Sequence, residues 1–216
     1  MTTTIGPNAR LIDAYLPTYD FSRVERREID APPAAVFDAM RHLDCLMIHS
    51  PITDLALFVR NLPEKLAGPR PGEQPATPPM PQFMLSTLFD GRTPEQDSLV
   101  GAWVGIAEHP GRALVFGAVG KPWLARVEWK RVLSDELAEF DEPGWAKLVA
   151  SLSVESVDTH RSVLTYEART KTTDTDSLIR FNRYWIAISP FVGAIMRSLL
   201  RTVDQAVDGY RGQAAS

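Results

Sequence analysis

The clearest pattern of apolar and polar positions lies near the C-terminal end of the chain. Apolar residues recur there every three or four positions over roughly seven turns, which predicts one long amphipathic helix. They are Phe181, Tyr184, Trp185, Ile188, Val192, Ile195, Leu199 and Val203. Asp174 or Asp176 can cap its N-terminus, and Pro190, which has no N–H to donate, is expected to bend it near Ile186. One face of this helix is therefore expected to be buried.

The chain opens with a strand that runs into a short helix. Residues 20–30 alternate imperfectly between apolar and charged side chains, as a half-buried strand does. Pro32 and Pro33 end this strand, and Pro33 suits the first turn of a helix. Apolar residues at helical spacing then predict a helix over residues 33–43.

Later segments have the character of antiparallel strands. They are rich in β-branched and aromatic residues, and they lie at residues 99–109, 112–120, 122–133, 145–157 and 162–171. The turn His109-Pro110-Gly111 joins the first two into a hairpin, and the polar turn 158–161 joins the last two. Ser134 is expected to cap a short helical turn after the middle strand.

The part between the opening helix and these strands is less regular. Helical spacing over residues 51–66 predicts another helix, and residues 82–89 predict a short one. The prolines between 68 and 81 exclude a regular element there. This stretch is either a lid over a cavity or a disordered insertion.

Strand, helices, a run of strands and a final long helix predict an α+β fold. We expect a helix-grip fold, a curved antiparallel sheet of six or seven strands packed on the long C-terminal helix. With 216 residues, 44% of them hydrophobic, the chain fits one domain. We place that domain at residues 20–209, between an N-terminal extension at 1–19 and a C-terminal tail at 210–216.

Composition excludes several classes of function. A net charge of -4 and a pI near 5.6 provide no global basic field for nucleic acid. The longest uncharged run, between Arg183 and Arg197, is about thirteen residues and shorter than the roughly twenty of a spanning helix. The single cysteine, Cys45, and an N-terminus without signal-peptide features favour a cytoplasmic location. We therefore predict no nucleic-acid partner and no membrane span.

Several strings resemble the START-like (SRPBCC) superfamily, which includes the birch-pollen allergen, lipid-transfer START domains and bacterial polyketide cyclases. They are VERREIDAPPAAVFDAM, EFDEPGWAKL, VLTYEART and DTDSLIRFNRYWIAISPF, and they look like a bacterial subgroup whose members mostly lack an assigned function. The resemblance covers roughly residues 21–207. It implies an apolar cavity that often holds a lipid, sterol, polyketide or hormone, and it implies no particular catalytic residues. The proline-rich stretch departs from the minimal domain of this superfamily.

The sequence offers little for metal or histidine chemistry. His42, Cys45 and His49 could share one helical face with donors suited to zinc, but no fourth ligand is near, which favours a buried thiol and surface histidines. His109 and His160 fall in predicted turns, where a general base does not face a pocket. We predict neither a metal nor a cofactor.

Glu167 and Arg169 alternate with their neighbours in a predicted strand and share one face. On a concave face this pair could orient a polar ligand group, or the carboxylate could act as an acid or base. On a convex face it would be a solvated charge pair. We favour this second interpretation, because the solvent-exposed faces of antiparallel sheets normally carry such charges.

Aromatic side chains are the main candidates for lining a cavity, although core packing alone also explains them. The candidate ligand-binding residues are Trp103, Trp129, Trp145, Tyr166, Glu167, Arg169, Tyr184, Trp185 and Ile188. Four arginines of the C-terminal helix are interpreted as its solvated face, with contact to an acidic partner as the alternative. They are Arg180, Arg183, Arg197 and Arg201.

The leading hypothesis is that the protein binds a small, largely apolar molecule between the sheet and the C-terminal helix. The first alternative is an enzyme of the polyketide cyclase or dehydrase kind, in which a carboxylate or tyrosine moves protons in the cavity. The second is a protein-interaction module whose cavity is filled by side chains. The sequence decides neither catalysis nor oligomeric state.

Overall fold

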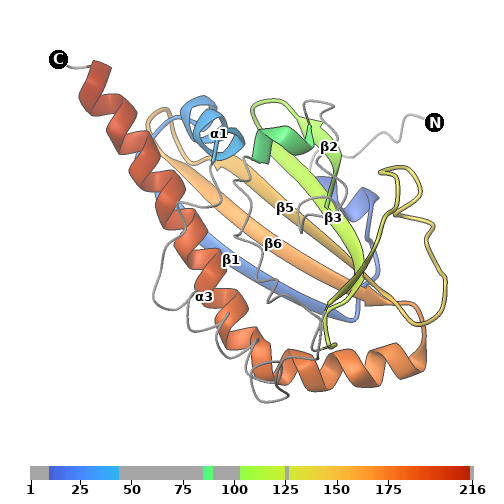
Figure 1. The fold of residues 1–216 in the computed structure, drawn as a ribbon. Helices are drawn as coiled ribbons and strands as arrows, with labels where there is room; N and C mark the ends of the chain where they lie inside the picture. Colours follow the sequence, from blue (N-terminus) through green and yellow to red (C-terminus); the bar gives the residue numbers. More distant parts are fainter. Residues whose placement is uncertain (1–9, 44–84, 90–102, 125–126, 215–216) are drawn as a thin grey trace, which may run out of the picture.

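A curved antiparallel sheet of six strands packs against one long C-terminal helix in the computed structural model, which describes residues 10–43, 85–89, 103–124 and 127–214 (Figure 1). The strands are β1 Phe21–Ile29, β2 Val104–His109, β3 Ala113–Lys121, β4 Glu128–Lys130, β5 Ala146–Ser156 and β6 Ser162–Thr172. The helices are α1 Pro33–Arg41 and α3 Thr175–Ala214, with 3-10 turns η1 Leu11–Ala14 and η3 Leu85–Leu88. The predicted α+β helix-grip fold is confirmed.

Hairpins connect most of the sheet. The strand order is β1-β6-β5-β3-β2, and β4 pairs with β3 beside this path. The chain's first strand thus lies next to its last, with Phe21 opposite Thr170. Both predicted hairpins are confirmed, with turns at residues 110–112 and 157–161.

The strand predicted at residues 122–133 is much shorter than expected. Only Glu128–Lys130 pairs with β3. Pro122 has no N–H for a ladder and follows directly on β3, so the chain turns there. The expected helical turn is a simple turn that begins at Leu133, whose carbonyl accepts the N–H groups of Glu136 and Leu137. The helix predicted at 51–66 and the proline-rich loop at 68–81 lie outside the described residues.

The sheet has two apolar faces, because its side chains alternate between them. One face packs against α1 and α3 through a core that includes Leu114, Leu152, Leu164, Leu200 and Val203. The other packs against η1 and the turn after β4 through Ile12, Leu16, Val115, Val132, Leu137 and Val149. Even-numbered residues of β5 and β6 lie on the α3 side, and odd-numbered residues lie on the η1 side.

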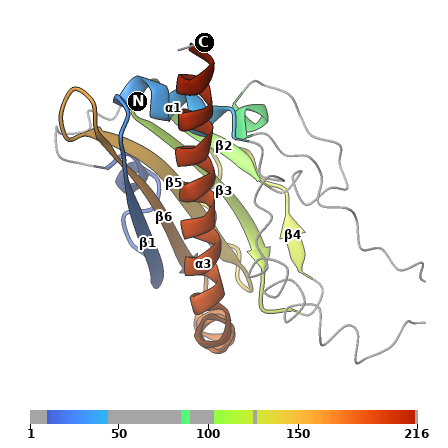
Figure 2. The ribbon, with the colours of Figure 1, turned by 90° about the vertical axis from the view of Figure 1, so that its left-hand side faces the viewer.

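Helix α3 runs across the sheet and bends along its length (Figures 1 and 2). Pro190 lies inside the helix and explains the bend, as predicted. Beyond it the buried stripe includes Met196 and Leu200, which the predicted spacing left out. Val192 and Ile195, which that spacing included, are only half-buried. A spacing taken along one straight helix does not follow the change of direction at the proline.

By length and composition, α3 is also apolar enough to cross a membrane. Residues Thr175–Gly209 contain an 18-residue window of mean hydropathy 1.4, of which 33% is buried in the structure. In this fold the same helix covers the sheet through Met196, Leu200 and Val203.

Asp174 caps the N-terminus of α3, which confirms one of the two predicted caps. Its Oδ1 accepts the N–H of Ser177 at 2.8 Å, and its Oδ2 accepts the Ser177 hydroxyl at 2.9 Å and the N–H of Gly144. These backbone hydrogen bonds, from Ser177 first and then Gly144, lower the pKa of Asp174 from 3.8 to about 2. The cap therefore fixes the start of α3 to the loop before β5.

We expect Asp174→Ala to lower the free energy of unfolding by about 1–2 kcal/mol, because two backbone donors lose their acceptor. Asp176→Ala, in the same first turn, should change it by only a few tenths of a kcal/mol. Since the folded-state pKa lies below 3.8, the contribution is present above about pH 4 and is lost as pH falls towards 2. Urea unfolding at pH 7 and pH 2.5 measures both effects. Equal losses in the two variants would contradict the role of the cap.

Candidate functional site

Three aromatic side chains gather on the α3 side of the sheet, near β3 and β4. The ring centroid of Trp103 lies 5.7 Å from that of Phe116 and 6.2 Å from that of Trp129. Trp129 is paired with Gly120 across β3 and β4. A Cβ atom at residue 120 would lie 2.6 Å from the Trp129 ring, so glycine is required for the indole to lie flat on the strand. This local register brings two predicted site residues, Trp103 and Trp129, together.

The indole N–H of Trp129 is buried and has no hydrogen-bond partner within the described part of the chain. A buried tryptophan N–H normally finds an acceptor, since an unmade hydrogen bond costs about 1–3 kcal/mol. An oxygen or nitrogen atom of a ligand placed against this ring would supply that acceptor. The aromatic group thus contains one buried donor that has no acceptor among the described residues.

A second aromatic group joins β1 to the first half of α3. Phe181 stacks on Trp185 at 5.9 Å between centroids and contacts Phe21 at 4.8 Å and Tyr184 at 5.7 Å. Trp123, after β3, meets the edge of Phe181 at 6.3 Å. Tyr184, Trp185 and Ile188 are all half-buried on α3. The structure therefore brings Tyr184 and Trp185 together in a second cluster.

The inner strands β5 and β6 carry half-buried residues on both faces of the sheet. On the α3 side, Leu148, Tyr166 and Ala168 are only half-buried although they belong to the inner strands β5 and β6. On the η1 side, Val149 and Arg169 are 1% exposed. Fully packed sheet interiors leave little surface on inner strands. The half-buried residues on the η1 side are mostly polar, such as Lys147 and Lys171, whereas those on the α3 side are mostly apolar.

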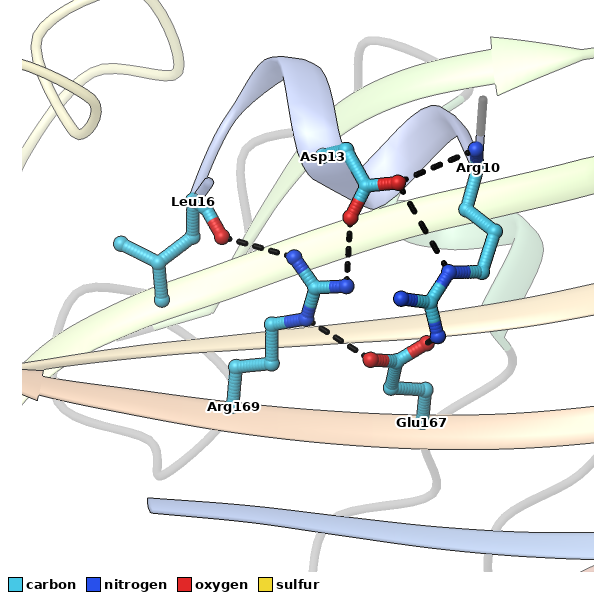
Figure 3. A network of polar contacts seen from close by, with 5 residues as sticks. All are labelled: Arg10, Asp13, Leu16, Glu167 and Arg169. Atoms are coloured by element: carbon cyan, nitrogen blue, oxygen red, sulfur yellow. Dashed lines mark hydrogen bonds and ion pairs between the residues drawn. The ribbon is translucent and has the colours of Figure 1, made fainter. Parts of the chain in front are cut away.

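Glu167 and Arg169 face away from α3 and are covered by the N-terminal segment (Figure 3). Arg169 Nε donates to Glu167 Oε1 at 2.7 Å, and its Nη2 donates to Asp13 Oδ1 at 2.5 Å. Its Nη1 donates to the carbonyl of Leu16 at 2.8 Å. Arg10 binds the other Glu167 oxygen at 2.7 Å. We call these five residues, Arg10, Asp13, Leu16, Glu167 and Arg169, the N-terminal clamp.

The clamp is charged and internally satisfied. Burial opposes the charge of Arg169, but hydrogen bonds to Asp13 and Glu167 outweigh it and raise the pKa of the guanidinium. Burial likewise opposes ionisation of Asp13, but Arg169 outweighs it and lowers the pKa of that carboxyl. Glu167 is 3% exposed, so the pair is on the convex face but is not solvated. A carboxylate held in this way is suited to fastening residues 10–19 onto the sheet.

The sequence alone does not predict the clamp, because it places residues 1–19 in an extension outside the domain. Ile12 and Leu16 are 1% and 3% exposed and belong to the core on this face. The ring of Tyr19 also lies 4.6 Å from the Arg169 guanidinium. The available signal was the apolar spacing of Leu11, Ile12 and Leu16 close to Asp13.

Two other predicted groups are separated from the aromatic clusters. Trp145 lies on the η1 side, where Lys121 is 4.2 Å from its ring and its Nε1 donates to Glu142 at 3.2 Å. His42 contacts the carbonyl of Asp38, one turn earlier in α1, at 3.0 Å. Its proposed partners Cys45 and His49 lie outside the described residues. Among the residues that are described, no three His, Cys, Asp or Glu side chains form a metal-binding group.

No family model matches the chain, and no curated protein matches its sequence. Among solved structures, MLL2253 from Mesorhizobium loti is similar at 12% identity and a TM-score of 0.37, covering 87% of this chain and 97% of that one. TTHA0849 from Thermus thermophilus is similar at 11% identity and a TM-score of 0.32, covering 88% and 99%. CalU16 from Micromonospora echinospora is similar at 14% identity and a TM-score of 0.28, covering 90% and 88%. At these values the likenesses assign no chemistry to this chain.

Proposed function

We propose that the protein binds a small, largely apolar ligand between the sheet and α3, with a hydrogen-bond acceptor directed at Trp129. The observation that carries this proposal is the buried indole N–H, which has no partner among the described residues and is set in an aromatic group on the α3 side. Apolar sites with a few directed polar groups are the usual form of small-molecule sites. The ligand class that fits is an aromatic, polyketide or lipid molecule with a carbonyl or hydroxyl oxygen.

The half-buried residues of the inner strands support the same proposal. Leu148, Tyr166 and Ala168 provide apolar surface on the side of the sheet that α3 covers. Burying such surface against a ligand contributes about 25 cal/mol for each Å² removed from water. The resemblance of the sequence to START-like proteins leads to the same class of ligand.

A cyclase or dehydrase is the second candidate, and Tyr166 favours it. Its side chain lies on the α3 side, where a phenol could exchange a proton with a bound ring precursor. Glu167, the carboxylate considered for this role, faces the N-terminal clamp instead. Release of a chemically altered molecule by the purified protein would identify this activity.

Native mass spectrometry of the purified protein, followed by denaturing extraction, tests the proposal directly. We expect a bound apolar molecule, or a saturable rise in melting temperature with one class in a panel of aromatic, polyketide and lipid compounds. A mass of the protein alone, together with no shift from the whole panel, would refute the proposal and favour an interaction module.

The variant Trp129→Phe tests the directed donor. It keeps an aromatic ring over Gly120 but removes the unpaired N–H, so stability should fall by less than about 1.5 kcal/mol. Affinity for the ligand should fall about 5- to 10-fold, as expected for one lost hydrogen bond. The matched control is Trp145→Phe on the opposite face, which should leave affinity unchanged. Equal affinities in all three proteins would exclude Trp129 as the donor.

A further inference from the structure

A groove of about 320 Å³ lies between β1 and α3, away from both aromatic clusters. It is lined by Arg26, Arg27, Ala194, Arg197, Leu200 and Arg201. Four of these six residues are arginines, from two elements far apart in the sequence. The protein as a whole carries a net charge of -4, so the groove is a local concentration of the opposite sign.

Two of the arginines are held in place by carboxylates. Arg27 binds Asp204 Oδ2 through Nη2 at 2.6 Å and through Nε at 2.7 Å. Arg197 binds Glu25 Oε1 at 2.8 Å. Both arginine side chains remain 40–50% exposed, so their outer N–H groups still face the solvent. The two carboxylates thus orient the guanidiniums without covering them.

The Glu25 carboxylate is shared with a third arginine. Arg23 donates to the same oxygen from Nε and Nη2, at 2.9 and 2.6 Å. Its guanidinium lies against Gly193 of α3, where an added Cβ atom would meet Nη2 and displace the guanidinium. Glu25 therefore faces two guanidiniums, which lower the pKa of its carboxyl despite burial.

The remaining two arginines of the groove are exposed. Arg26 and Arg201 have no ion-pair or hydrogen-bond partner in the ranges that the structure describes. Arginines thus line the groove at four positions, while the carboxylates that pair with Arg27 and Arg197 are Asp204 and Glu25. The positive charge of this surface is not balanced by its own ion pairs.

We propose that this groove binds a phosphate group. Guanidiniums are planar forks that donate two parallel hydrogen bonds to phosphate oxygens, and charge-assisted bonds of this kind are the strong ones. Arg27 and Arg197 are oriented in advance, Arg201 adds an unpaired charge from α3, and Arg26 adds another from the edge strand β1, where it alternates with Arg27. Ala194 and Leu200 add an aliphatic surface for the carbon atoms that carry the phosphate. This site is separate from the ligand face at Trp129.

Isothermal titration calorimetry with inorganic pyrophosphate at fixed ionic strength measures the affinity of the groove and tests the proposal. We expect saturable binding to the wild type and at least about tenfold weaker binding to the double variant Arg26→Gln/Arg201→Gln. Both residues are exposed and unpaired within the described chain, so the variant should fold normally. The matched control is Arg180→Gln/Arg183→Gln, exposed arginines of the same helix outside the groove, which should bind as the wild type does. No saturable binding to the wild type, or equal weakening in both variants, would overturn the site.

Vesicles distinguish a lipid phosphate from a soluble one. If the phosphate belongs to a lipid, phosphatidylcholine vesicles containing phosphatidic acid should sediment with the wild type and the control, but not with Arg26→Gln/Arg201→Gln. Pyrophosphate should then release the protein. Pyrophosphate binding without such sedimentation would assign a soluble phosphate compound. Sedimentation that is equal in all three proteins would exclude the groove as the lipid site.

Discussion

Replacing Arg169 with methionine is expected to lower the free energy of unfolding by about 3–5 kcal/mol, the usual cost of removing one partner from a buried ion pair. Arg169 is 1% exposed and binds Glu167, Asp13 and the Leu16 carbonyl. Without it, Glu167 keeps a buried charge whose remaining ion-pair partner, Arg10, is half exposed. Chemical unfolding followed by circular dichroism measures the loss.

The matched control is Arg161→Met, in the turn between β5 and β6. Arg161 also binds two carboxylates, those of Asp158 and Glu28, both at 2.8–2.9 Å, but all three side chains are exposed. Solvent screens such pairs, so the control should lose at most about 1 kcal/mol. The two variants differ mainly in burial. Similar losses in both would show that the clamp is not a buried electrostatic element.

Loss of the clamp should also release the N-terminal segment. Arg169 reaches Asp13 and Leu16 from the middle of β6, so residues 10–19 depend on it for their position on the sheet. Ile12 and Leu16 would then be exposed together with the core beneath them. We expect limited proteolysis of Arg169→Met to cut first in this segment.

The sequence placed Glu167 and Arg169 on one face, but it could not determine which face. Strand alternation is a local property, and both faces of β6 turned out to be covered. The cover of the convex face is η1, which precedes β6 by about 150 residues, and no local pattern links the two. For the same reason the sequence predicts Trp145 as a ligand-binding residue beside Trp103 and Trp129. In the folded chain it lies on the opposite, η1 side of the sheet.

The fold itself was predictable because its signals are local. The spacing of α3, the cap at Asp174, Pro190 and the two hairpin turns each depend on a few neighbouring residues, and together they restrict the topology. The pairing of Trp129 with Gly120 is different, since it requires the register of β3 and β4. The groove of arginines is also a property of the folded chain, because its residues come from β1 and α3.

Phe181→Ala is expected to lower the free energy of unfolding by about 3–5 kcal/mol, the usual cost of removing a buried aromatic ring. Phe181 is 1% exposed and is the only residue of its cluster in ring contact with Phe21, Trp123, Tyr184 and Trp185 within the described chain. Its removal leaves a cavity between β1 and α3 that the bulky rings cannot readily fill.

The matched control is Ile186→Ala, on the same half of α3 but 71% exposed, which should change stability by less than about 0.5 kcal/mol. Hydrogen exchange should show faster opening of residues 175–190 in Phe181→Ala, while the half of α3 beyond Pro190 stays protected by Met196, Leu200 and Val203. Uniform loss of protection along α3 would instead mean that the helix unfolds as one unit. The part of α3 before Pro190 would then not unfold separately from the part beyond it. Its packing over the ligand face would depend on the same core as the rest of the helix.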